Sequence, residues 1–133
     1  MLDSIWLPPT VHIWSGMLVL TATLAAVVYT AVRAWRRRDL GPAGNAILIF
    51  AQLTLMAQAV LGIKLLDQGL GPLQLFIHYL GGLGPLLFFL VYYWLPSPVR
   101  TRRWLSFGVA ASAFLFAVMA FGIGMSYVAG QVA

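Results

Sequence analysis

Hydrophobic residues fall into four long runs that are separated by short polar, basic or proline-containing stretches. The runs cover roughly residues 10–34, 45–66, 74–95 and 104–128. Each run contains at least the ~20 residues that an α-helix needs to cross a ~30 Å hydrocarbon core. The pattern predicts four membrane-spanning helices that take up nearly the whole chain. We therefore expect one domain over residues 1–133, an all-α, integral membrane four-helix bundle.

Most prolines lie outside the predicted helices, where they and neighbouring glycines act as breakers. Gly41 and Pro42 separate the first two runs, and Pro96 and Pro98 separate the last two. Only Pro85 lies inside a run, where a proline removes a helix hydrogen bond. We expect a kink in the third helix at this residue.

The composition supports a membrane protein, because 62% of the residues are hydrophobic and only 8% are charged. The net charge of +5 does not indicate nucleic-acid binding, since seven of the eight basic residues lie in two loops. These residues are Arg33, Arg36, Arg37, Arg38, Arg100, Arg102 and Arg103. Alternating helices place both loops on one side, which the positive-inside rule makes cytoplasmic. We expect a multi-pass protein of the prokaryotic plasma (inner) membrane, N-out and C-out, with the lipid bilayer as its main partner.

Two further features of the chain bear on its chemistry and on its processing. There is no cysteine, which excludes disulfides, thioether attachment of haem and thiolate ligands. The opening residues lack the basic segment of a cleaved signal peptide, so we expect the first helix to be retained.

A sequence offset of 66 residues superimposes the first predicted helical hairpin on the second. It aligns His12 with His78 and Gly16 with Gly82. Two hairpins in a pseudo-twofold relation, about an axis along the membrane normal, would bring the first and third helices face to face. We expect the two histidines to lie at equal depth near the outer face.

His12 and His78 are the main candidates for a functional site. An ionisable side chain inside a membrane span is costly, and it is a functional hypothesis by default. Two neutral imidazoles from facing helices make suitable axial ligands for haem iron. Glycine four residues beyond each histidine, at Gly16 and Gly82, would leave room for a flat cofactor. The prediction is a bis-histidine haem b, with His12 and His78 as the metal ligands.

Other residues near the outer end complete this candidate site. Lys64 is the basic side chain expected there and is predicted to bind the haem propionates. Gln58 is a weaker candidate for contact with haem or a quinone. A zinc or copper site is disfavoured, because no carboxylate or thiolate lies at that depth to complete the ligand set. A plainer alternative is that each histidine lies at the membrane interface, close to water.

Three short stretches resemble one half of the haem A synthase family. They are His12-Ile13-Trp14-Ser15-Gly16, Gln58-Ala59-Val60-Leu61-Gly62 and Ile77-His78-Tyr79-Leu80. The resemblance implies a four-helix bundle that holds haem between histidines on its first and third helices. The chain departs from the family at Ile13, where arginine is typical, and at Pro9, where the catalytic half has glutamate; it contains no glutamate at all. The resemblance therefore implies a haem-holding scaffold more than synthase activity.

These observations leave three hypotheses about function. The first is a membrane b-type cytochrome that exchanges electrons with a quinone or another carrier, or serves as a haem-bearing subunit of a respiratory or photosynthetic complex. The second is a haem-free structural or assembly subunit of a membrane complex. The third is a half-sized haem A synthase that acts as a homodimer. In the first two cases the chain is not an enzyme, and a membrane protein partner is expected.

Overall fold

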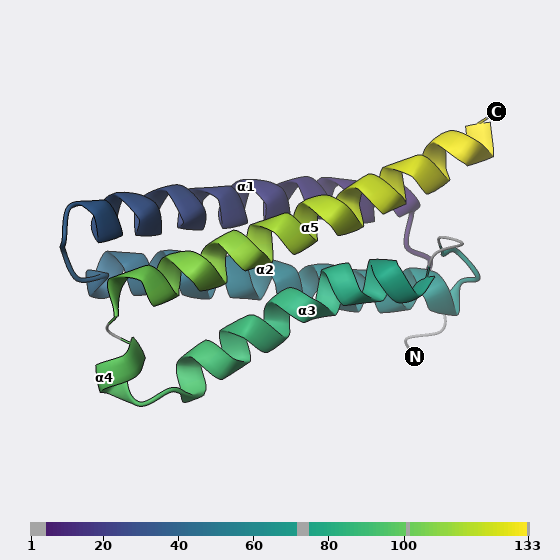
Figure 1. Ribbon diagram of the computed structural model, residues 1–133. Coiled ribbons are helices and arrows are strands. Elements are labelled where there is room, and N and C mark those ends of the chain that lie inside the picture. Colours follow the sequence, from purple (N-terminus) through teal and green to yellow (C-terminus); the bar gives the residue numbers. More distant parts are fainter. Residues whose placement is uncertain (1–4, 72–74, 101, 133) are drawn as a thin grey trace.

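The computed structural model describes residues 5–71, 75–100 and 102–132. The described chain is helical and its long helices lie side by side (Figure 1). The helices are α1 (Pro9–Trp35), α2 (Gly41–Asp67), α3 (Leu75–Trp94), α4 (Ser97–Arg100) and α5 (Arg103–Val132).

Among the described residues, four helices are long and apolar enough to cross a membrane. They are α1, α2, α3 and α5, and large apolar side chains on all of them face outward, such as Trp14, Phe76 and Leu115. Lipid tails solvate such a surface as readily as protein does. The prediction of an all-α membrane four-helix bundle is confirmed at this level.

The observed helix ends differ from the expected ones in three places. α2 begins at Gly41 instead of near residue 45, because Pro42 lies in the first turn, where a missing N–H costs no helix hydrogen bond. Gly41 itself has a φ of +69°, a conformation that glycine adopts readily. α5 continues to Val132, four residues beyond the expected end near 128. The one-turn helix α4 was not predicted, and it follows one expected breaker, Pro96, and contains the other, Pro98.

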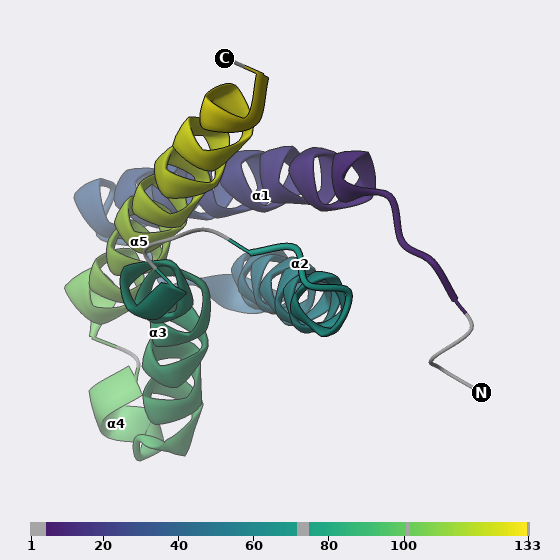
Figure 2. The same ribbon diagram turned by 90° about the vertical axis from the view of Figure 1, so that its right-hand side faces the viewer.

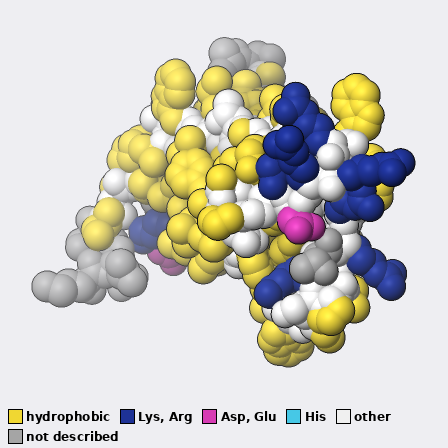
Figure 3. All heavy atoms as spheres, turned by 90° about the vertical axis from the view of Figure 1, so that its left-hand side faces the viewer, with side chains coloured by type: hydrophobic (Ala, Val, Ile, Leu, Met, Phe, Trp, Pro, Cys, Tyr) yellow, Lys and Arg dark blue, Asp and Glu magenta, His cyan; other side chains and the backbone are white. Residues whose placement is uncertain are grey.

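The helices alternate in direction, so the chain has two distinct ends. The α1–α2 loop and α4 lie at one end, and the start of α1, the end of α2 and the end of α5 lie at the other (Figure 1). We call these the loop end and the terminal end. Lys and Arg side chains gather at the loop end, as Figure 3 shows in a view onto it.

α5 lies between α1 and α3 and packs closely on both of them (Figure 2). Small side chains at helical spacing, Ala110, Ala113 and Ala117, are buried on α5 and allow this approach. Phe89 and Tyr92 of α3 are the largest side chains in the core. The α2–α3 contact is the least extensive of the main helix contacts. The bundle is thus tightly packed around α5 and loosely packed between α2 and α3.

The third helix bends along its length in both views (Figures 1 and 2), in agreement with the kink expected at Pro85. Pro85 is fully buried, so neighbouring helices shield the backbone that it disrupts. At Gly84, next to Pro85, α3 still packs closely on α5, because Gly84 lies against the ring of Phe116.

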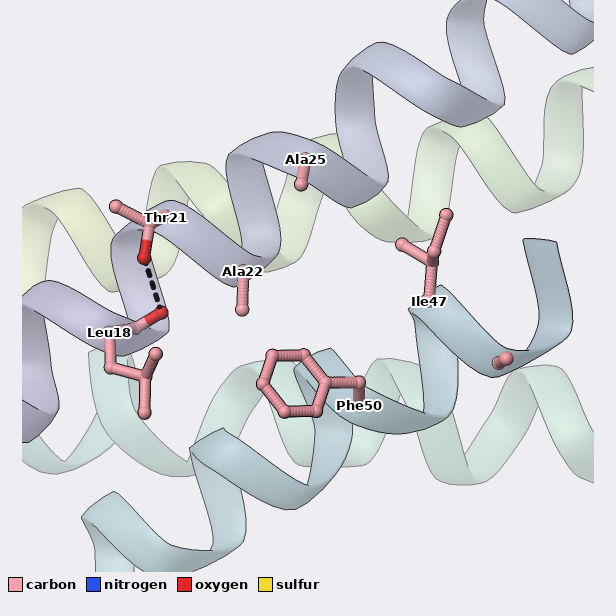
Figure 4. Close-up of a pocket in the computed structure, with 7 residues that line it drawn as sticks. Leu18, Thr21, Ala22, Ala25, Ile47 and Phe50 are labelled. Atoms are coloured by element: carbon pink, nitrogen blue, oxygen red, sulfur yellow. Dashed lines mark hydrogen bonds between the residues drawn. The ribbon is translucent and has the colours of Figure 1, made fainter. Parts of the chain in front are cut away.

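A shallow apolar groove lies on the outer surface between α1 and α2, and it has a volume of about 420 Å³. Leu18, Ala22, Ala25, Ile47 and Phe50 line most of it (Figure 4). The hydroxyl of Thr21 in this groove donates to the carbonyl of Leu18 at 2.9 Å. Because its one polar side chain is satisfied within its own helix, we assign no ligand chemistry to this groove.

Candidate functional site

The structure brings His12 and His78 together near the terminal end. Each is the fourth residue of its helix, α1 and α3 respectively. Their ring centroids are 6.2 Å apart and the ring planes are inclined by 58°. Both side chains are half-buried. The sequence prediction that these two residues meet is therefore reflected in the geometry.

Both imidazoles line a cavity of about 220 Å³ that is bounded by all four long helices. Its walls are mainly aliphatic, and no charged side chain is among the described residues that line it. The polar side chains in the walls are His12, His78, Gln58, Tyr79 and Tyr127. The cavity therefore offers apolar surface and a few directed polar groups, as small-molecule and cofactor sites do.

His12 is held by a hydrogen-bonded group on α1 and α2. The Gln58 amide nitrogen donates to the His12 carbonyl oxygen at 3.1 Å and lies 3.2 Å from His12 Nε2. The hydroxyl of Ser15 donates to the Gln58 amide oxygen, which fixes the amide with its nitrogen toward His12. His12 Nε2 then acts as the acceptor, and its proton resides on Nδ1.

His12 Nδ1 is buried and has no hydrogen-bond partner among the described residues. A buried donor left unpaired costs about 1–3 kcal/mol. His12 is therefore positioned by Gln58 and Ser15, but its ring remains only partly satisfied. A hydrogen-bond acceptor beside Nδ1 or a rotation of the ring would relieve this cost.

His78 has a different environment. Its Nδ1 lies 3.2 Å from the carbonyl oxygen of Ala120 on α5. A carbonyl only accepts, so Nδ1 carries the proton and Nε2 has a free lone pair. This is the arrangement in which metal-ligating histidines are usually held. The ring also lies against Gly124, where an added Cβ would be 3.7 Å from His78 Cε1.

The two predicted glycines differ in their surroundings. A Cβ on Gly16 would lie 3.1 Å from the Phe121 ring and 3.3 Å from the Gln58 amide nitrogen. A Cβ on Gly82 would meet nothing within 4 Å. The space beside Gly16 is therefore filled by protein, whereas the space beside Gly82 is open to the cavity.

The structure does not bring Lys64 to the cavity. Its ammonium group pairs with the Asp67 carboxylate at 2.7 Å, and Lys64 is not among the residues that line the cavity. Gln68, at the end of α2, is occupied by the main chain of Leu7, which it contacts at 3.1 and 3.2 Å. Tyr79 and Tyr127, which carry hydroxyl groups, are among the residues that line the cavity.

Several contacts of the site were not predicted from the sequence. They involve the Ser15 hydroxyl, the Ala120 carbonyl, Phe121 and Gly124. Gly124 lies four residues after Ala120 on α5, and this spacing places both beside one ring. A search for small residues at helical spacing on the fourth predicted span, which is α5 in the structure, would have indicated this face.

The spacing of the two rings fits a bis-histidine haem, and His12 Nε2 would have to release the Gln58 amide nitrogen in order to bind iron. A metal–imidazole bond of about 2 Å, plus about 1 Å from the nitrogen to the ring centre, places two axial rings about 6 Å apart. The observed separation is 6.2 Å. No group of three or more His, Asp or Glu side chains is found among the described residues, so a zinc-type ligand set is not assembled.

The volume of the cavity fits a haem less well than the spacing of the two histidines does. Cofactor-sized pockets usually measure about 300–1,000 Å³, and the cavity between the histidines measures about 220 Å³. The loose contact between α2 and α3 forms one side of the same cavity. A porphyrin would require widening on this side, next to the open position at Gly82.

No family model, curated protein or solved structure matches this chain.

Proposed function

We propose that this protein is a membrane b-type cytochrome that holds haem b between His12 and His78. The observation that carries the proposal is the 6.2 Å separation of two imidazoles on different hairpins, in an apolar cavity. Haem held in this way supplies reversible one-electron exchange. The protein would transfer electrons within the membrane, alone or as a haem-bearing subunit of a respiratory or photosynthetic complex.

The residues of the chain have separate roles in this proposal. The Ala120 carbonyl holds the tautomer of His78 that presents Nε2 as a ligand. Gln58 and Ser15 hold the backbone and ring of His12 at the start of α1. The walls around the pair are mainly aliphatic, and the absence of any carboxylate among the described lining residues favours electron transfer over the oxidation of a haem substituent. Of the features that the resemblance to haem A synthases implies, we propose only the haem-holding scaffold for this chain.

Membrane orientation and partners are part of the same proposal. We place the loop end in the cytoplasm, because arginine-rich loops are retained there, and both termini outside. The His pair then lies near the outer face of a prokaryotic plasma membrane. The hairpins α1–α2 and α3–α5 would be related by a pseudo-twofold axis, with the α2–α3 contact looser than its counterpart α1–α5. With so little mass outside the membrane, the electron partner is a quinone or a second membrane protein.

The direct test is the optical spectrum of the purified full-length protein, produced in cells with an ample haem supply. We expect a dithionite-reduced b-type α band and haem equimolar with protein. Protein that is folded, helical and colourless under these conditions would contradict the proposal and would favour a haem-free structural subunit. Conversion of added haem into a more oxidised product would instead support a synthase.

Orientation can be tested with paired reporter fusions. Alkaline phosphatase, which is active outside the plasma membrane, should be active after Ala133 and inactive after Asp39. A fluorescent protein that matures in the cytoplasm should give the opposite result at the same two positions. The physical reason is the bias of arginine toward the cytoplasmic side. The reverse pattern would place the His pair at the inner face.

The hydrogen bond from the Gln58 amide to the His12 carbonyl oxygen predicts a moderate effect on haem binding, because it orients the first turn of α1, which carries His12. Partners that orient a metal ligand typically contribute about 10- to 100-fold in affinity. In the variant Gln58→Leu we expect haem to be retained but to transfer to apomyoglobin at least about tenfold faster. Gln52→Leu is a matched control on the same helix, since Gln52 does not line the cavity. Equal transfer rates in both variants would show that Gln58 does not position the ligand.

A further inference from the structure

The loop end carries most of the positive charge of the molecule. Its basic residues are Arg33, Arg36, Arg37, Arg38, Arg100, Arg102 and Arg103. Figure 3 shows Lys and Arg side chains gathered over this end. The chain contains three acidic residues, and of these Asp67 lies at the terminal end, paired with Lys64. Asp39 is the acidic residue described at the loop end. The charge here is far from neutralised by the protein.

Two of these arginines have structural roles. Arg33 Nε donates to the Asp39 carbonyl oxygen at 2.7 Å and closes the α1–α2 loop. Arg100 donates to the Tyr93 carbonyl oxygen at 3.4 Å, near the end of α3. Both acceptors are backbone carbonyls. Within the described residues, no arginine of the loop end is paired with a carboxylate.

The other five arginines are exposed, and we call them the open arginines: Arg36, Arg37, Arg38, Arg102 and Arg103. Arg37 takes a φ of +54°, at the point where the chain turns out of α1. A guanidinium presents a planar fork of donors that matches phosphate oxygens in a bidentate manner. Among the described residues no side-chain hydrogen bond or ion pair is found for these five guanidinium groups, and they are well suited to a surface of phosphate groups.

Exposed tryptophans at the same end fix the depth of this charge in the membrane. Trp35, Trp94 and Trp104 are 82%, 84% and 62% exposed. Indole rings prefer the level of the lipid headgroups. Trp35 is adjacent to Arg36 and Trp104 is adjacent to Arg103, so the open arginines lie at the same level.

We propose that the open arginines form a binding surface for anionic phospholipid headgroups. Charge complementarity favours a phosphate-bearing partner, and the exposed tryptophans favour a lipid over a soluble polyanion. Basic residues near a membrane surface each contribute to the attraction of anionic lipids, and the attraction decreases with salt. This surface is independent of the His pair, because it lies at the opposite end of the bundle.

The test is native mass spectrometry of the full-length protein in detergent with equimolar phosphatidylglycerol and phosphatidylcholine. We expect phosphatidylglycerol adducts to exceed phosphatidylcholine adducts by about tenfold. The selectivity should disappear when all five open arginines are replaced by Gln, and it should be unchanged in Lys64→Gln. Circular dichroism of each variant establishes that the helices are retained.

If the variant with all five open arginines replaced by Gln does not fold, a second measurement tests the proposal. Wild-type protein should lose its preference for phosphatidylglycerol as sodium chloride is raised toward 1 M, where the screening length is about 3 Å. Equal binding of both lipids at low salt would overturn the proposal. Tripolyphosphate that displaces phosphatidylglycerol at equal concentration would also overturn it, in favour of a soluble polyanion.

Discussion

Replacement of either His12 or His78 by alanine should abolish the b-type spectrum and reduce bound haem at least tenfold. In the proposed cytochrome each substitution would remove one of the two residues that hold the haem, and the described lining residues offer no charged group in its place. We expect the larger loss for His78→Ala, because His78 is already held by the Ala120 carbonyl in the ligand tautomer. The measurement is the dithionite-reduced spectrum together with haem extraction from purified protein.

The chain offers close controls for this experiment. Trp14 and Phe76 lie two residues from the respective histidines and are 70% and 78% exposed. Trp14→Ala and Phe76→Ala should therefore leave the spectrum unchanged. Added imidazole should partly restore the spectrum of His78→Ala, since the lost ligand is the same chemical group. A full spectrum in both histidine variants would exclude ligation by this pair.

Substitution of Gly81 should have the largest effect on stability. A Cβ at this position would lie 2.7 Å from the Ala120 Cβ and 3.1 Å from the Phe116 carbonyl oxygen. Because part of this obstacle is backbone, α3 would have to move away from α5. Overpacking of this kind typically costs about 1–3 kcal/mol. We expect Gly81→Ala to lower the free energy of unfolding by this amount, measured by circular dichroism in a titration with denaturing detergent.

The neighbouring residue provides the control. An added Cβ on Gly82 meets nothing within 4 Å, and alanine has a helix propensity about 1 kcal/mol better than glycine. Gly82→Ala should therefore be neutral or slightly stabilising. If both variants are equally stable, the α3–α5 contact at Gly81 is not tight. Gly81→Ala should also weaken haem binding, because the displaced α3 carries His78 away from the Ala120 carbonyl.

The helices were predictable because their signal is simple. Each apolar run exceeds the length needed to cross a bilayer, and such runs have few alternative structures in lipid. The ends were less predictable, since Gly41 and Pro42 act as breakers in one context and as the first turn of a helix in another. The short helix α4 was missed for the same reason, because Pro96 and Pro98 indicated only a loop.

The meeting of His12 and His78 was predictable from charge and repetition in the sequence. The arginine loops placed both residues at one level, and the 66-residue offset placed them at equivalent positions. The groups around them were not predictable in the same way. The acceptor for His78 is a backbone carbonyl, which every residue of α5 possesses, so no side-chain pattern marks Ala120.

The remaining differences between the predicted and the observed site follow from local packing. Gly16 was expected to leave space for a cofactor, but Phe121 and Gln58 occupy that space. Lys64 was expected to face the cavity, but Asp67 lies one turn away and pairs with it. Depth in the membrane can be inferred from sequence, whereas direction around a helix axis depends on neighbours that sequence alone does not locate.

The central position of α5 has a consequence for biogenesis. This helix contacts both histidine-bearing helices, and it supplies the carbonyl that holds His78 and the ring that packs on Gly16. It also follows the other three long helices in the chain, so it leaves the ribosome after them. The surroundings of His78 and Gly16 are therefore completed only after synthesis of α5. In the proposed cytochrome, haem would be bound after all four long helices have been made.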